Sequence, residues 1–300
     1  MTKSFKKCEK RILSLFSPGS EFTYNNVKYV VKFAAKPTCQ NGEPKTDIFV
    51  RTESKNNYKD IKDFKISYKK ANAQFIENKL TRDRSEQIFG ENWCEIIHNS
   101  IVPLRDEFEK RILIHKKQYR NTKAGSFLLG FKFELLRVKS GTLSGKMALS
   151  YKQKVEIYSG ANLTEDKRNA FVFGTRIQNS GVAEFIFEET DRATTCQDVI
   201  SKMKTIDEYL SLYPDIYFAC KALNYRSVSR KYDSNRHLAV FVDWNIKNGM
   251  LDANLVYDKP LLVDGKTICE KLKSVMNDLS IKTTYDINKS NTNQSIIVHE

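Results

Sequence analysis

Residues 35–70 read AKPTCQNGEPKTDIFVRTESKNNYKDIKDFKISYKK and contain two runs of strand-forming residues, TDIFVRT at 46–52 and IKDFKISY at 61–68. A polar segment joins the two runs, and the arrangement predicts a pair of antiparallel strands. Each run carries acidic side chains among apolar ones. Side chains alternate between the two faces of a strand, so such runs place apolar residues in a core and leave charged groups on the other side.

The alternation predicts which charged side chains meet. In the second run, Asp63 and Lys65 share one face with Ser67, and the apolar residues between them share the other. We therefore expect Asp47 of the first run to converge with Asp63 on one open side, with Lys65 next to them. Two carboxylates a few ångströms apart repel unless a cation lies between them, and Mg²⁺ prefers such oxygen ligands. The residue types indicate metal-dependent phosphodiester hydrolysis, in which Lys65 orients the attacking water or stabilises the transition state.

The same stretch resembles the PD-(D/E)xK nucleases, and within them type II restriction endonucleases whose first motif reads G-x-P-K-T-D. Residues 42–47 read GEPKTD, and residues 63–65 read DFK after a gap of 16 residues (63 minus 47). The resemblance covers about residues 20–85. It implies that Asp47 and Asp63 are catalytic carboxylates that bind Mg²⁺, that Lys65 is the catalytic lysine, and that the core is a mixed sheet flanked by helices.

A second D-x-K follows Asp47 more closely, since Asp60 and Lys62 begin and end the triplet DIK. These two side chains would share the face of the apolar residues, which we expect to be buried, so strand alternation favours Asp63 and Lys65.

The roles of neighbouring polar residues stay open at this point. Lys45 and Ser67 are candidates for support of the site, and either could instead be exposed surface. Glu9 or Glu21 could supply a third carboxylate, although nothing in the local sequence distinguishes either from a surface residue.

The formal net charge of +14 is unevenly distributed along the sequence. Residues 1–150 hold 30 Lys and Arg against 16 Asp and Glu, whereas residues 151–300 hold 20 against 20. Basic surface of this extent attracts polyanions, and nucleic acid is the commonest partner of that kind. The candidate DNA-binding residues form two groups, one near the centre and one in a later basic segment: Lys69, Lys70, Arg82 and Arg84, and Arg226, Arg230, Lys231 and Arg236.

The predicted fold is α/β (α+β), a restriction-endonuclease-like mixed β-sheet flanked by helices with added C-terminal strands and a hairpin. We expect a catalytic core at residues 1–140 and a fold-completing, DNA-recognising portion at 141–300, continuous with the core. Helical spacing predicts helices at 4–16, 71–80 and 195–212. The aromatic and aliphatic run at 126–138 favours a strand, with a helix as the alternative, and Asn248-Gly249 predicts a hairpin turn.

The predicted function is sequence-specific, Mg²⁺-dependent restriction of double-stranded DNA, leaving 5′-phosphate and 3′-hydroxyl ends. A DNA methyltransferase would then protect host sites in the cell, and a homodimer would suit a palindromic target. The alternatives are a nuclease of defence or repair without a fixed site, and a non-catalytic DNA-binding protein. The sequence has no apolar run of membrane-spanning length and no signal peptide at its N-terminus, so we expect a cytoplasmic location with no membrane partner. The six dispersed cysteines predict reduced thiols and do not suggest a zinc site.

Overall fold

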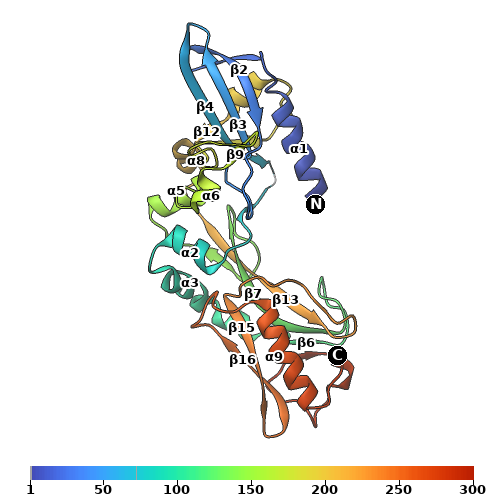
Figure 1. Ribbon diagram of the computed structural model, residues 1–300. Coiled ribbons are helices and arrows are strands. Elements are labelled where there is room, and N and C mark those ends of the chain that lie inside the picture. The colour runs from blue at the N-terminus through green and yellow to red at the C-terminus, as the bar shows by residue number, and fades with distance from the viewer. Residues whose placement is uncertain (1, 72) are drawn as a thin grey trace. The chain divides into compact units, whose positions relative to one another are not determined.

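The computed structural model describes residues 2–71 and 73–300, with side chains described from residue 5 onwards. The chain is a mixed α+β protein whose sheets are flanked by helices (Figure 1). It divides into two compact units, unit 1 (Met1–Gln74 and Ser150–Pro214) and unit 2 (Phe75–Leu149 and Asp215–Glu300). This division differs from the expected break near residue 140. The physical reason is that residues 185–189 return to unit 1 as a strand parallel to residues 66–70.

Unit 1 contains a six-stranded sheet with the order β1-β2-β3-β4-β11-β12 (Figure 1). In that order the strands span Glu21–Tyr24, Val27–Ala35, Ile48–Ser54, Asn57–Lys70, Phe185–Glu189 and Lys204–Thr205. Neighbouring strands are antiparallel except β4 and β11, which are parallel, so the sheet is mixed. The ends of β2, β4 and β11 therefore lie at the same end of the sheet as the start of β3.

The helices of unit 1 are α1 (Thr2–Ser14), α5 (Tyr151–Ser159), α6 (Glu165–Arg168), α7 (Cys196–Lys202) and α8 (Ile206–Leu212), and a small ribbon pairs β9 (Phe171–Val172) with β10 (Thr175–Arg176). The helix predicted at the N-terminus is present. The single helix predicted over 195–212 is divided into two helices, α7 and α8. Thr195 and Thr205 are the N-cap residues of these helices, and each forms a capping box.

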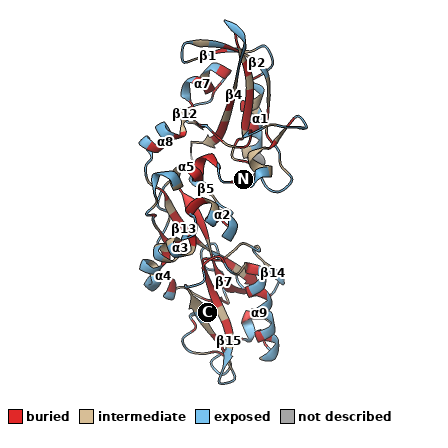
Figure 2. Cartoon of the chain, turned by 60° about the vertical axis from the view of Figure 1, so that its left-hand side comes forward, coloured by how far each residue is buried: buried red, intermediate tan, exposed pale blue. Residues whose placement is uncertain are grey.

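The core of unit 1 lies between the sheet, α1 and α7, and Figure 2 shows buried residues along β4. Phe64, Ile66 and Tyr68 are fully buried there, as strand alternation predicts. Ile12 and Phe16 of α1 pack into the same cluster, so the apolar side of this helix covers the sheet. Burial of side chains of this size contributes roughly 1.5–3 kcal/mol each.

Unit 2 has a sheet with the central order β14-β13-β7-β15-β16, and shorter strands pair at its margins (Figure 1). These five strands span Lys231–Tyr232, Tyr217–Arg226, Ser126–Leu136, Val240–Lys247 and Met250–Val256. The marginal strands are β5 (Phe75–Glu77), β6 (Ile114–His115), β8 (Ser144–Lys146) and β17 (Val298–His299). Strand β7 is buried along almost its whole length, visible in Figure 2, so it forms the centre of the unit.

The helices of unit 2 are α2 (Arg82–Phe89), α3 (Trp93–Ile101), α4 (Arg105–Glu109) and α9 (Gly265–Asp278), with 3₁₀ turns η1 (Val102–Leu104) and η2 (Thr284–Asp286). The predicted strand at 126–138 and the hairpin at Asn248-Gly249 are confirmed by β7 and by β15 with β16. The prediction of a helix at 71–80 is wrong for the residues of this range that the structure describes. Phe75–Glu77 instead pairs with β7, and the helix begins after Thr81, whose side chain caps the Arg84 amide; Asn72 lies outside the described residues.

Among the residues that the structure describes, none of the helices has both the length and the apolar character needed to cross a membrane.

Candidate catalytic site at the end of strands β3 and β4

Asp47 lies immediately before β3 and is fixed by the end of β4. Its backbone N–H donates to the Ile66 carbonyl at 3.0 Å, and its Oδ2 accepts a hydrogen bond from the Tyr68 backbone N–H at 2.8 Å. The Ser67 hydroxyl lies 3.4 Å from the same carboxylate oxygen, a long and therefore weak contact. These bonds hold the carboxylate of Asp47 at one end of the sheet.

The GEPKTD loop that carries Asp47 rests on Gly181. The backbone N–H groups of Lys45 and Thr46 both donate to the Gly181 carbonyl, at 3.0 and 3.2 Å. Pro44 is buried against the same glycine, where an added Cβ would lie 2.8 Å from the proline Cβ and 1.8 Å from the Lys167 carbonyl oxygen. Only glycine permits this close approach, so the conformation of the loop depends on unit 1 residues far away in the sequence.

The register between β3 and β4 separates Asp63 from Asp47. Ile48 pairs with Ile66, so Asp47 comes opposite Ser67, whereas Asp63 pairs with Arg51. Arg51 lies four residues after Asp47. At a rise of about 3.3 Å per residue, Asp63, which is opposite Arg51, lies about 13 Å along β4 from Ser67, which is opposite Asp47. Arg51 also donates two hydrogen bonds to Asp63, each of 2.8 Å. The expected convergence of Asp47 with Asp63 is therefore not found.

Lys65 is likewise engaged elsewhere. It pairs with Phe49 in the register, and its Nζ lies 2.7 Å from a carboxylate oxygen of Glu184. Strand alternation places Asp63, Lys65 and Ser67 on the predicted face, since the residues between them are in the core. The error concerned position along the strand: in an antiparallel pair, a residue at the start of the first strand faces the end of the second.

Lys69, Glu9 and Lys36 are charged groups that interact electrostatically with Asp47, although sequence reasoning gave Glu9 only as an open alternative. Glu9 is 7% exposed on α1, and its Oε2 lies 2.8 Å from the Nζ of Lys36, the residue directly after β2. Glu21, the other candidate, instead pairs with Lys28 and Lys55, which lower its pKa to about 2. The carboxylate that accompanies Asp47 is thus that of Glu9.

The electrostatics of the site follow from burial and from these neighbours. Burial raises the pKa of Asp47, and the Glu9 carboxylate raises it further, while the Lys69 ammonium and the Tyr68 amide oppose the shift. Burial would lower the pKa of Lys36, but its hydrogen bond to Glu9 and the negative charge of Asp47 raise it overall. Two carboxylates therefore share a partly desolvated site in which positive charge is favoured.

Lys69 is a lysine near the end of β4 whose position is set by the register with β3. It follows Ser67, the residue opposite Asp47, by two positions and points to the same face of β4. Among the described residues Lys69 makes no ion pair, and its ammonium interacts with the charge of Asp47. Residues 67–69, SYK, thus have the spacing of D-x-K with serine in the acidic position. The register shift between Glu53 and Ser54 creates this offset, so a count from the turn, where Ser54 pairs with Asn57, would not have found the triplet.

Asp47 and Glu9 are the oxygen ligands that the site could offer to a metal ion. In the described part of the chain, no group of three or more His, Cys, Asp or Glu side chains is arranged to hold a metal. Two carboxylates nevertheless suit Mg²⁺, which commonly binds to one or two protein carboxylates and completes its shell with water and substrate phosphates. The donor set therefore fits Mg²⁺ better than zinc, which prefers sulfur and nitrogen ligands.

The predicted DNA-binding residues differ in how far their side chains are exposed and in whether they already pair with a carboxylate. Arg84 is 9% exposed in its side chain and bonds to Glu77, so it has a packing role in unit 2. Arg226 is paired with Asp233 at 3.2 Å. The remaining members lie on the surface or are half-buried: Lys69 and Lys70 on β4, Arg82 on α2, Arg230, Lys231 on β14, and Arg236.

The positive charge is shared equally by the two units. Unit 1 holds 24 Lys and Arg against 17 Asp and Glu, and unit 2 holds 26 against 19, so each has a net charge of +7. The excess seen in residues 1–150 is therefore not confined to the unit with Asp47, because residues 75–149 belong to unit 2.

Comparison with models of protein families, with curated proteins and with solved structures gives no match.

Proposed function

We propose that the chain is a Mg²⁺-dependent endonuclease that hydrolyses phosphodiester bonds of double-stranded DNA, with a restriction-endonuclease-like fold in unit 1. The observation that carries this proposal is the electrostatic interaction of the Asp47 carboxylate, on the loop reading GEPKTD, with the Glu9 carboxylate of α1 and the Lys69 ammonium of β4. The resemblance of that loop to the first motif of PD-(D/E)xK nucleases supports the same reaction.

In this proposal Asp47 and Glu9 hold the metal, which would neutralise charge on the phosphate and activate a water molecule. Asp47 is the better fixed of the two carboxylates, since the Tyr68 amide holds one of its oxygens. Glu9 is positioned by α1, whose Arg11 donates a 2.7 Å hydrogen bond to the Ala193 carbonyl and pairs with Glu189. Both ligands therefore stand on elements tied to the sheet.

Lys69 is the residue that we assign to the transition state. A lysine ammonium next to the scissile phosphate stabilises the negative charge that develops there and orients the attacking water. Lys36 has a different role, because its ammonium already neutralises Glu9. It balances the charge of the two carboxylates when no divalent cation is bound.

Sequence-specific restriction is the form of this activity that we favour, with the methyltransferase partner and the dimer described above. The support is the GEPKTD loop and a net charge of +7 on each unit, which suits a chain that contacts DNA with both. Digestion of unmethylated DNA of known sequence tests it. Discrete fragments ending in 5′-phosphates are expected, and a smear or nicking would instead favour a defence or repair nuclease.

A non-catalytic DNA-binding protein is the competing class, favoured by the same positive charge. Purified chain incubated with varied unmethylated DNAs and Mg²⁺ separates the two. Binding without any cleavage, while the protein remains folded, would refute the nuclease.

A further inference from the structure

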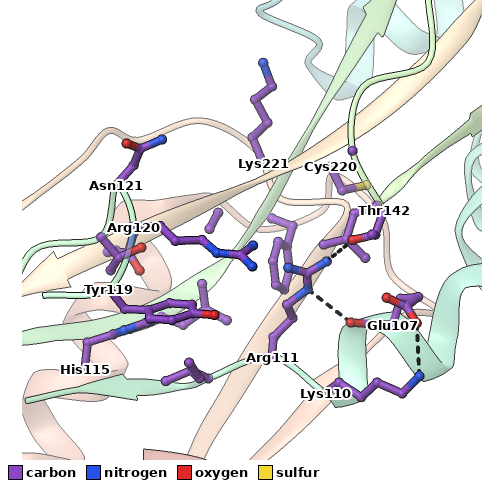
Figure 3. A pocket seen from close by; sticks show the side chains of 18 of the residues that line it. Glu107, Lys110, Arg111, His115, Tyr119, Arg120, Asn121, Thr142, Cys220 and Lys221 are labelled. Carbon is purple, nitrogen blue, oxygen red and sulfur yellow. Dashed lines mark hydrogen bonds and ion pairs between the residues drawn. The ribbon is translucent and has the colours of Figure 1, made fainter. Parts of the chain in front are cut away.

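Unit 2 contains a pocket of about 760 Å³ that is lined by residues of unit 2 alone (Figure 3). Its walls come from residues 107–122, 128–143 and 220–224. In the first of these segments the charged residues that line the pocket are Lys110, Arg111 and Arg120, with one acidic residue, Glu107. This wall belongs to unit 2, whereas the catalytic residues proposed above belong to unit 1.

Two arginine side chains converge in this pocket. Figure 3 shows the guanidinium of Arg120 extending toward that of Arg111. Arg111 is held in place because its Nε donates to the Glu107 carbonyl at 3.1 Å and its Nη2 donates to the Thr142 hydroxyl. Neither arginine has a carboxylate partner within the described residues. Like charges that face one another in this way are unfavourable unless an anion lies between them.

The backbone of Arg120 supports a functional interpretation of this convergence. Tyr119 and Thr122 exchange backbone hydrogen bonds of 3.0 and 2.9 Å, which close a two-residue turn with Arg120 at φ 51°. Asn, Asp and Gly adopt this region readily, whereas a long side chain does so at a cost of roughly 1–2 kcal/mol. A residue kept in such a conformation at a pocket is a candidate for ligand contact.

His115 provides a second, independent sign of a ligand. It lines the pocket, is 6% exposed, and its Nδ1 has no hydrogen-bond partner among the described residues. Burial and the nearby His299 lower the pKa of His115, which disfavours the protonated ring. A buried polar atom without a protein partner is uncommon, and an ordered water or a bound group in the pocket would satisfy it.

We propose that Arg111 and Arg120 form an arginine clamp that binds a phosphate group of a DNA strand. Guanidinium groups match the oxygens of a phosphate in pairs, and the exposed ring of Tyr119 beside them offers a surface for the adjoining base or sugar. The net charge of +7 on unit 2 favours a polyanion over a small carboxylate ligand. The choice of DNA as the ligand rests on the proposed function.

The test is duplex DNA binding by the full chain carrying Asp47→Asn, measured by fluorescence anisotropy in EDTA across a range of KCl concentrations. Arg120→Asn removes the charge and keeps a residue suited to the turn, so the fold is retained. We expect its affinity at 0.15 M salt to fall about five- to tenfold, and the slope of log K against log salt to fall by about 1. Its melting temperature should be unchanged or higher.

Two further variants serve as controls for the clamp. Lys266→Ala removes a charge from an exposed residue of α9 outside the pocket, and we expect less than a twofold loss. Arg120→Lys keeps the positive charge, so its slope of log K against log salt should be close to that of the parent chain.

Equal affinity and equal slope in Arg120→Asn and Lys266→Ala would overturn the clamp, as would absence of DNA binding by the parent chain. Because the assay contains no metal and an inactive chain, it is independent of cleavage. Weakened binding by Arg120→Asn in a chain whose native form cuts no DNA would retain the clamp and refute the nuclease.

Discussion

Arg51 donates two hydrogen bonds of 2.8 Å to Asp63, which places this carboxylate in a surface ion pair. The pair is partly exposed, and pairs of this kind contribute about 0–1 kcal/mol to stability. We therefore predict that Asp63→Asn lowers the rate of DNA cleavage by less than about threefold and changes the free energy of unfolding by about 1 kcal/mol or less. Single-turnover cleavage and urea unfolding measure the two effects. A loss of cleavage in a folded Asp63→Asn chain would return Asp63 to the catalytic site.

Lys36 competes with a divalent cation for Glu9. Replacing Lys36 with Met removes an ammonium 2.8 Å from the Glu9 carboxylate. Two unit charges about 4 Å apart interact by about 1 kcal/mol even in water, so Mn²⁺ should bind at least about fivefold more tightly. Isothermal titration calorimetry with Mn²⁺ measures this affinity. Lys32→Met is the matched control, since Lys32 lies within β2 and pairs with Glu53, and its affinity should match the wild type. Equal or weaker Mn²⁺ binding in Lys36→Met would contradict the assignment of Glu9 as a ligand.

Gly181 supports the loop that carries Asp47. Gly181→Ala places a methyl group 1.8 Å from the Lys167 carbonyl oxygen, so the two segments must separate. Overpacking of this kind costs typically about 1–3 kcal/mol, and the displaced loop should also reduce Mn²⁺ affinity. Thermal unfolding and calorimetry test both expectations.

The control for Gly181→Ala is Gly174→Ala, where the backbone has φ 77° and no atom lies within 4 Å of an added Cβ. We expect Gly174→Ala to lose stability from backbone strain alone, about 1 kcal/mol, with Mn²⁺ affinity retained. An equal loss of metal affinity in both variants would show that the contact with Lys167 does not position Asp47.

Glu189 links α1 to the sheet and makes the stability of unit 1 depend on pH. Burial raises the pKa of Glu189, but hydrogen bonds from the Tyr68 hydroxyl, Arg11 and the Ala193 amide lower it overall from 4.5. A carboxylate with a lowered pKa stabilises the fold above its unfolded pKa, and this contribution is lost as pH falls through the folded value. Stability should therefore fall below about pH 4.5, and Glu189→Gln should weaken this dependence.

Urea unfolding at pH 3.5 to 7 measures the effect of Glu189→Gln. The control is Glu165→Gln, an exposed residue of unit 1, which should leave the pH dependence as in the wild type. Identical profiles for wild type and Glu189→Gln would exclude a stabilising role for the Glu189 carboxylate.

Sequence reasoning located the loop and the faces of the strands but misplaced the partners of Asp47. Alternation of side chains is a local property, so it correctly assigned Phe64 and Ile66 to the core. Pairing along the strands depends on the turn, and β4 begins at Asn57, earlier than its apolar pattern indicated. A count from the turn, where Ser54 pairs with Asn57, would place Phe64 opposite Asp47, and the register shift between Glu53 and Ser54 brings Ser67 there instead.

Glu9 and the division into units could not be obtained from local patterns. Glu9 reaches the site because α1 packs on the sheet, and that docking depends on Arg11 and Glu189, residues 178 positions apart. The parallel pairing of β4 with β11 likewise joins segments separated by the first part of unit 2. Such contacts arise from tertiary packing, and a single sequence does not encode them as a motif.

The most direct measurement of the central claim is the single-turnover rate of DNA cleavage with Mg²⁺ for the wild type, Lys69→Met and Lys65→Met. Both substitutions remove a lysine of β4 from the same face, but Lys65 is paired with Glu184 and Lys69 interacts with Asp47. We predict cleavage by the wild type, a loss of about 100-fold or more in Lys69→Met, and a rate within about threefold of the wild type in Lys65→Met. Full activity in Lys69→Met, together with loss of activity in a folded Lys65→Met chain, would contradict the site built on Asp47, Glu9 and Lys69.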